Sequence, residues 1–112
     1  MEEEIPRKPY IVSREFNRNR IEIYRYTLEV FGYFQAERYM KIIRASLDTL
    51  PDFYYAYPEC RHLATKSRIY RNVILDAHLI LYRIIPERIE VLDIVHSASS
   101  IRKIQGTRKI HL

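Results

Sequence analysis

The chain has 112 residues, a length that fits one domain and leaves little room for a second. Hydrophobic residues make up 47% of it and charged residues 29%, which is a globular composition and excludes an intrinsically disordered chain. Its 19 Lys and Arg against 14 Asp and Glu leave a net charge of +5, which favours an anionic partner without specifying one.

The sequence carries no signal for a cofactor or for secretion. Its single cysteine, Cys60, has no partner for an internal disulfide, as is usual in a reducing compartment. No signal-peptide pattern is visible, and no apolar run has membrane-spanning length. Glycine-rich phosphate loops, Cys/His sets with metal-ligand spacing and a Ser-His-Asp order are all absent from the sequence. We therefore expect a cytoplasmic protein with no cofactor, no metal and no membrane partner.

The first half of the chain predicts a flexible lead-in (1–9), a short strand (10–12) and two helices. Ser13 has the side chain of a helix N-cap, and Gly32 suits the left-handed residue that closes a helix. A second helical pattern follows at once and is expected to stop at Pro51. Two helices joined so closely must fold back as a hairpin. The positions expected to face the core are Phe16, Ile23, Tyr24, Leu28 and Phe31, then Ala36, Tyr39, Met40, Ile43, Leu47 and Leu50.

The second half of the chain predicts strands. After an irregular stretch at 52–66, the hydrophobic period changes to two and β-branched residues dominate. Strands are expected at 69–75, 78–85 and 89–96, joined by tight turns into an antiparallel meander with the N-terminal strand at its edge. The predicted fold is therefore β-α-α-β-β-β, a single α+β domain in which the helical hairpin packs on an antiparallel three- to four-stranded sheet.

Basic residues gather in two stretches that contain no acidic residue. Residues 60–75 carry Arg61, Lys66, Arg68 and Arg71. Residues 97–112, which include a basic tail at 101–112, carry Arg102, Lys103, Arg108 and Lys109. These stretches are the strongest signal in the sequence for an anionic partner.

This order of elements, with these residues, resembles the RelE/ParE toxin superfamily from about Tyr10 to Ser100. In the hairpin, the series similar to the "Y-T", "W/F-G" and "A-x-x-Y" pattern of ParE-type toxins is Ile23-Tyr24-Arg25-Tyr26-Thr27, Phe31-Gly32, Ala36 and Arg38-Tyr39. In the sheet, the segments similar to "YR", "LIxYRI" and "xVEVLxxxH" are Tyr70-Arg71, Leu79 to Ile84 and Ile89 to His96. The hairpin series favours the ParE branch.

The resemblance implies the toxin of a type II toxin–antitoxin, or plasmid-stabilisation, system, held in a hetero-oligomer by a cognate antitoxin. For the ParE branch it implies inhibition of DNA gyrase by binding, without catalysis. The alternatives are a RelE-like ribosome-dependent mRNA endonuclease, or a decayed member that only binds its antitoxin. Ser99 stands where the family often has an arginine, and Leu79 where RelE-type nucleases place one. Both departures weaken the nuclease alternative, and Ser99 leaves open whether the toxin is active.

Each alternative selects its own residues. RNA cleavage needs proton transfer and cations over the phosphate, for which the candidates are His96, His78, Tyr82, Arg71 and Arg83. Target binding needs aromatic and cationic anchors, for which they are Tyr54, Tyr55, Tyr57, Arg61, Arg102 and Lys103. An acidic, amphipathic antitoxin segment is expected to dock on Ile21, Tyr33 and Phe34. Each set also has a structural alternative: a strand-end histidine bonded to backbone, tyrosines that form a small core, and apolar residues that complete the main core.

Overall fold

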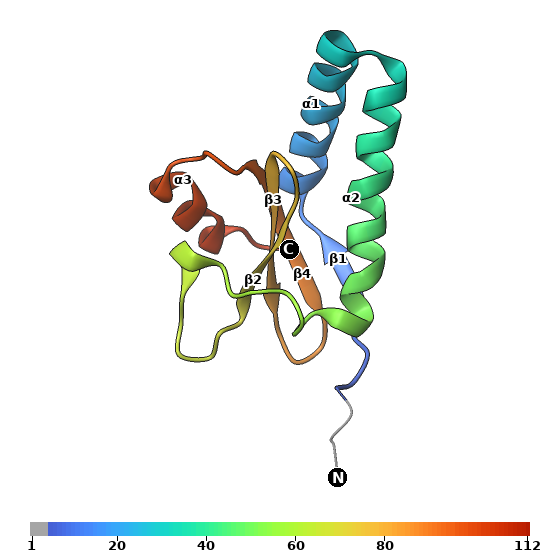
Figure 1. Cartoon of the computed structure of the whole chain (residues 1–112). Helices are drawn as coiled ribbons and strands as arrows, with labels where there is room; N and C mark the ends of the chain where they lie inside the picture. The colour runs from blue at the N-terminus through green and yellow to red at the C-terminus, as the bar shows by residue number, and fades with distance from the viewer. Residues whose placement is uncertain (1–4) are drawn as a thin grey trace.

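The computed structural model describes residues 5–112 and shows a sheet between a helical hairpin and a short C-terminal helix (Figure 1). The elements are β1 (Tyr10–Val12), α1 (Arg14–Phe31), α2 (Tyr33–Phe53), the 3-10 turn η1 (Arg61–Leu63), β2 (Tyr70–Ile74), β3 (His78–Ile84), β4 (Ile89–His96), α3 (Ile101–Gly106) and the 3-10 turn η2 (Thr107–Lys109). The predicted α+β fold with a helical hairpin is confirmed. None of the described helices is both long and apolar enough to span a membrane.

The hairpin begins and turns where the sequence predicts. The Ser13 hydroxyl accepts the Phe16 N–H at 2.9 Å, which is the expected N-cap bond. Gly32 has φ of 89°, in the left-handed region that favours glycine, and separates α1 from α2 by one residue. The predicted end at Pro51 is wrong, because α2 continues to Phe53 with Pro51 buried inside its last turns. A proline there removes one helical hydrogen bond, and its burial against the domain offsets that loss.

The sheet has the strand order β1-β4-β3-β2 and is mixed. Strands β2, β3 and β4 form the predicted antiparallel meander, whereas β1 pairs with β4 in parallel, with Tyr10 opposite Ile89. The parallel direction of β1 follows from the hairpin. The helix α1 leads the chain away from one end of the sheet, and α2 leads it back to that same end, where the chain continues towards β2. Consequently β2, and with it β4, runs in the same direction as β1. A bulge at Leu81/Tyr82 leaves Leu92 without a partner in β3.

Both faces of the sheet are covered, so the domain has two hydrophobic cores. The hairpin core includes Phe16, Ile43, Leu47, Leu50, Ile80, Tyr82, Val91 and Ile94. The second core includes Cys60, Leu63, Tyr70, Leu81, Leu92, Val95 and Ile104. Burial on both faces explains why seven of the eight residues of β4 are buried. The apolar periodicity of the sequence predicts the first core but not α3, the helix that closes the second.

The N-terminal segment lies against the bottom of the hairpin. The Tyr54 hydroxyl donates to the Pro6 carbonyl at 2.6 Å, and the Lys8 N–H donates to the Pro51 carbonyl at 3.1 Å. The flexible lead-in proposed for residues 1–9 falls in part on residues 1–4, which lie outside the described residues.

The hairpin extends past the sheet, because α1 starts part-way along β4. The Ser13 N–H donates to the Val91 carbonyl at 2.9 Å, so α1 begins level with the third residue of β4. From there β4 has five more residues, about 17 Å of strand, whereas the 18 residues of α1 span about 27 Å. The far end of the hairpin therefore overhangs the sheet, as Figure 1 shows at the top of the molecule.

Candidate functional site

The overhanging end of the hairpin exposes a cluster of large apolar side chains, which we call the hairpin tip. Its members are 40% to 85% exposed and comprise Tyr26, Leu28, Val30, Phe31, Tyr33 and Phe34. The expectation that Leu28 and Phe31 face the core is wrong, because the sheet ends before α1 reaches them. The Tyr33 and Phe34 rings meet edge to face at 5.6 Å, which makes a firm aromatic corner. An apolar cluster of this kind on a small domain indicates a partner surface.

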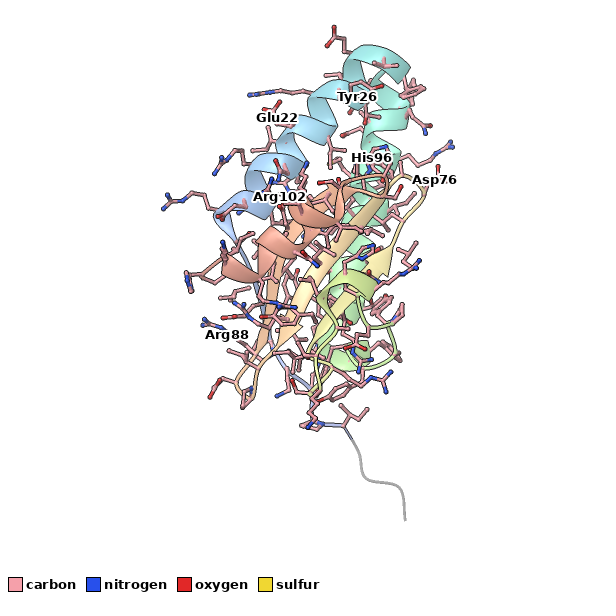
Figure 2. All side chains as sticks on the ribbon, turned by 90° about the vertical axis from the view of Figure 1, so that its left-hand side faces the viewer. Glu22, Tyr26, Asp76, Arg88, His96 and Arg102 are labelled. Atoms are coloured by element: carbon pink, nitrogen blue, oxygen red, sulfur yellow. The ribbon has the colours of Figure 1, made fainter. Side chains whose placement is uncertain are left out.

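A groove of about 510 Å³ lies under this overhang, between α1 and the end of the sheet. Apolar side chains from α1 and β4 line much of it, namely Ile23, Tyr26, Phe31, Ile94 and Val95. Its polar lining includes Asn19, Glu22, His78, His96 and Lys103. Figure 2 looks onto this side, with Glu22 and Tyr26 on α1, His96 at the end of the sheet and Arg102 on α3. The groove therefore joins the apolar hairpin to the basic C-terminal helix.

The two candidate histidines lie directly opposite each other at the end of the groove. His78 pairs with His96 in the sheet register, and their ring centroids are 5.5 Å apart. The Tyr39 hydroxyl lies 2.6 Å from His78 Nδ1. Burial, and then the neighbouring His96, lower the pKa of His78, so its neutral form is favoured. The Ala98 N–H donates to His96 Nδ1 at 3.0 Å, which occupies the lone pair that a neutral Nε2–H imidazole would use as a base.

The two arginine candidates for the nuclease site bind other groups of the protein, away from the histidine pair. Arg83 donates to the Glu90 carboxylate at 2.7 Å, and it lies at the opposite end of β3 from His78. The two positions are five residue steps apart, which corresponds to about 17 Å of strand. Arg71 donates to the carbonyl oxygens of Tyr55 and Tyr57.

Tyr82 cannot act as a surface group in this structure. The side chain is fully buried, its hydroxyl donates to the Tyr54 carbonyl at 2.6 Å, and burial raises its pKa. We therefore correct the nuclease set by assigning Tyr82 to the hairpin core. The remaining candidates are brought together only as the His78–His96 pair.

The target-binding candidates likewise divide into buried and exposed residues. Tyr54 is fully buried and belongs to the core, so it is withdrawn as a target contact. Tyr57 is half-buried, with its hydroxyl 2.5 Å from that of Thr49. Tyr55 is 48% exposed, and Arg71 lies over its ring at 5.4 Å. The cationic candidates Arg61, Arg102 and Lys103 are all exposed on η1 and α3, which pack against each other.

A family model described as the ParE toxin of the type II toxin–antitoxin system, parDE, matches residues 10–101. The chain belongs to this family. Among solved structures, the "Chromosomal ParDE TA system from P. aeruginosa" contains a chain similar to it, with a TM-score of 0.66 and 14% sequence identity. The match covers 80% of this chain and 95% of that chain, and at this identity it shows the fold alone. No curated protein matches the sequence.

As a ParE-family toxin, the chain is the toxin component of a type II toxin–antitoxin system, and its partner is an antitoxin. Of the antitoxin-binding candidates, Ile21 is 42% exposed on α1, and Tyr33 and Phe34 lie at the hairpin tip. Of the other tip residues, Leu28 and Phe31 belong to the apolar stripe that the sequence assigns to the core, and Tyr26 and Val30 lie outside that stripe. A comparison of helix and strand lengths was the available signal, since α1 is longer than the part of β4 beside it.

Proposed function

We propose that this ParE-family toxin inhibits DNA gyrase by binding it, with no chemical step of its own, in the bacterial cytoplasm. The observation that carries the proposal is the separation of the groups that RNA cleavage would require. His78 and His96 lie at one end of the sheet, and Arg83 is held by Glu90 at the other. A cleavage site needs these groups around one phosphate. Binding requires only exposed anchors, which Tyr55, the α3 cations and Arg61 supply.

We further propose that the antitoxin neutralises the toxin with an acidic amphipathic segment laid over the hairpin. The hairpin tip and the groove offer the apolar surface that one face of such a segment needs. Lys103 lines the groove, and Arg102 stands beside it on α3. Carboxylates on the edge of the segment would face these cations, which favours correct orientation and fast association.

The decisive experiment compares the wild-type toxin with His96→Ala in two assays. In a supercoiling assay with purified gyrase, we expect the wild type to inhibit the enzyme and to accumulate cleaved DNA. His96→Ala is expected to inhibit within about threefold of the wild type, since losing one exposed hydrogen bond costs about 1 kcal/mol or less. In a translating extract, neither protein is expected to cleave mRNA.

The opposite pattern would overturn the proposal. Cleavage of mRNA by the wild type that disappears in His96→Ala, without an effect on gyrase, would establish the nuclease alternative. Normal growth on expression without antitoxin, together with inactivity in both assays, would identify a decayed toxin that only binds its antitoxin. Ser99, whose N–H closes a turn on the His96 carbonyl at 2.9 Å, makes that control necessary, because the family often has an arginine there.

A further inference from the structure

The excess positive charge of the protein lies on the side of the sheet away from the hairpin. The segments 60–75 and 97–112 contain eight Arg and Lys residues and no Asp or Glu. Leu63 from η1 and Ile104 from α3 belong to the same core, so the two segments meet on this side. Within the first segment, Val73 packs in the hairpin core, and Arg71 is bonded to the carbonyls of Tyr55 and Tyr57. The fold therefore joins two basic stretches, distant in sequence, into one surface, which faces the viewer in Figure 2. We call it the basic face.

Most of these cations have no carboxylate partner among residues 5–112. Arg68 lies 3.6 Å from Glu59, and Arg71 is bonded to backbone carbonyls. The six others form no ion pair within the part of the chain that the structure describes: Arg61, Lys66, Arg102, Lys103, Arg108 and Lys109. Unpaired cations of one sign on a single surface create the potential that attracts a polyanion.

Interactions beneath the surface attach its segments to the sheet. The guanidinium carbons of Arg83 and Arg108 lie over the Tyr70 ring, at 5.8 Å and 5.3 Å from its centroid. Arg83 also donates to the carbonyl of Ile110 at 3.2 Å, which fastens the end of the chain to the sheet. Ile104 is 3% exposed, so α3 is anchored by a buried side chain. A fixed arrangement of cations suits a ligand with a regular spacing of charges.

The composition of the basic face distinguishes between possible polyanions. Single-stranded nucleic acid is normally held by exposed aromatic rings on which bases stack. The two basic segments contain no phenylalanine and one tyrosine, Tyr70, which is buried, and Arg71 lies over the ring of the neighbouring Tyr55. An amphipathic antitoxin segment needs a contiguous apolar surface, and this face exposes few large apolar side chains, chiefly Ile74 and Ile101. Duplex DNA needs only cations for its phosphates.

We propose that the basic face binds the phosphate backbone of duplex DNA, without sequence preference. That this DNA is the segment held by gyrase rests on the proposed function, whereas the binding surface itself does not. The toxin would then contact enzyme and DNA together, with its hairpin left free for the antitoxin. The phosphate ligand is common to DNA and RNA, and the probes below separate the two sources.

The test measures binding of the full-length toxin to a short labelled duplex by fluorescence anisotropy over a salt series. With about four phosphate contacts, affinity is expected to fall about 100-fold between about 50 and 200 mM salt. The triple variant Arg61→Gln/Arg102→Gln/Lys109→Gln removes three exposed cations that form no ion pair among the described residues. It is expected to bind at least about tenfold more weakly and to lower the salt slope by about 2 to 3.

The matched control is Arg38→Gln/Lys41→Gln/Arg44→Gln, which removes the same charge from exposed positions on α2 of the hairpin. Its duplex affinity is expected to stay within about threefold of the wild type, because these positions lie away from the basic face. Equal losses in both variants, or no measurable duplex binding by the wild type, would overturn the inference. Tighter binding to single-stranded RNA, or to polyglutamate, than to duplex would also overturn it, in favour of those ligands.

The gyrase assay separates this inference from the proposed function. If the wild type binds duplex through the basic face but does not inhibit gyrase, the proposed function is wrong, and the inference that the basic face binds DNA is confirmed. If it inhibits gyrase and the triple variant does so equally well, the contact with gyrase-bound DNA is refuted. When both proposals hold, the triple variant should need at least about tenfold more protein for inhibition, in line with its lower duplex affinity.

Discussion

The hairpin and the opposite side of the sheet differ in what they offer a partner. Residues 14–53 carry seven basic and six acidic residues, so the hairpin is nearly neutral, and it exposes aromatic rings at its tip. The two segments of the basic face carry eight cations and no acid, and their one tyrosine, Tyr70, is buried. A neutral apolar surface selects a partner by shape, whereas a cationic surface selects by charge and responds to salt. One small domain thus presents two surfaces suited to different classes of ligand.

This difference has a structural origin in the length of the elements. The hairpin tip is exposed because α1 and α2 are longer than the strands that they cover. The six-residue α3 is short enough to stay within the area of the sheet, so Ile104 is buried against it, and Arg102 and Lys103 are exposed together with Ile101. The hairpin therefore displays apolar surface beyond the sheet, and α3 displays charge over it.

Replacing the aromatic corner of the tip is the change expected to have the largest effect. The double variant Tyr33→Ser/Phe34→Ser should weaken antitoxin binding at least about 100-fold, since central aromatic anchors contribute about 2 kcal/mol or more each. Its unfolding temperature should stay close to that of the wild type, because both rings are mostly exposed. Isothermal titration calorimetry with the cognate antitoxin measures the affinity.

The control for this variant is Arg102→Gln/Lys109→Gln on the basic face. It should weaken antitoxin binding by no more than about tenfold, as expected for charges at the rim of an interface. If the cation variant lost more affinity than the aromatic variant, the antitoxin would be held by charge, and the division of roles between the surfaces would be wrong.

Breaking the ion pair under the basic face is expected to have the next largest effect. Burial raises the pKa of Glu90, but hydrogen bonds from Arg88 and Arg83 hold it below its usual value. Arg83→Met leaves that buried carboxylate with Arg88 alone and releases the Ile110 carbonyl. We expect the free energy of unfolding at neutral pH to fall by about 2 kcal/mol, measured by urea denaturation.

The stabilisation from the Arg83–Glu90 pair depends on pH. A carboxyl whose pKa is lowered by folding stabilises the protein fully above its pKa in the unfolded chain, and the contribution is lost as the pH falls through its pKa in the folded protein. The wild type and Arg83→Met should therefore converge in stability under acidic conditions. Arg88→Met, at a more exposed position, is the comparison and should cost less. Equal losses from the two variants would show that the link from Arg83 to the C-terminal segment adds nothing.

The sequence predicts the parts of the fold that depend on neighbouring residues. Ser13, Gly32 and the strand from Ile89 to His96 lie where local patterns place them. Periodicity tells which side of a helix is apolar, but it does not tell what lies opposite. For that reason the stripe through Leu28 and Phe31 is assigned to the core, although the sheet ends before reaching it.

The candidate site was harder to predict, because its geometry depends on contacts between distant residues. Arg83 and Glu90 are neighbours across two strands, and the Ile110 carbonyl reaches Arg83 from the end of the chain. No local sequence pattern indicates these bonds. Arg83 is therefore a candidate phosphate ligand in the sequence, whereas in the structure it is bonded to Glu90 and Ile110. The helix α3 has six residues, too few for a hydrophobic period to be recognised, and only its single buried isoleucine shows that it packs.

The smallest expected effect concerns Asp93, which links the two regions. Its Oδ1 accepts the Asn19 side-chain N–H of α1 at 2.7 Å and the Ile94 N–H at 2.8 Å. Burial raises the pKa of Asp93, and these two hydrogen bonds and Lys103 of α3 lower it by less. Folding raises the pKa of Asp93. Its contribution to stability is therefore complete below its pKa in the unfolded chain, and it is lost as the pH rises through its pKa in the folded protein. The ionised carboxylate is therefore a net cost at pH 7.

Asp93→Asn keeps the oxygen acceptor and removes the charge, so it should raise the free energy of unfolding at pH 7 by about 1 kcal/mol or less. This gain in the free energy of unfolding should shrink as the pH falls towards the pKa of Asp93 in the unfolded chain, since the wild-type carboxyl then becomes neutral as well. Asp76→Asn, in the exposed turn between β2 and β3, removes an equal charge without burial and should show no such trend. An advantage for Asp93→Asn that stayed constant with pH would exclude charge burial as its cause. The contribution of the Asn19–Asp93 contact between α1 and β4 would then depend on hydrogen-bond geometry alone.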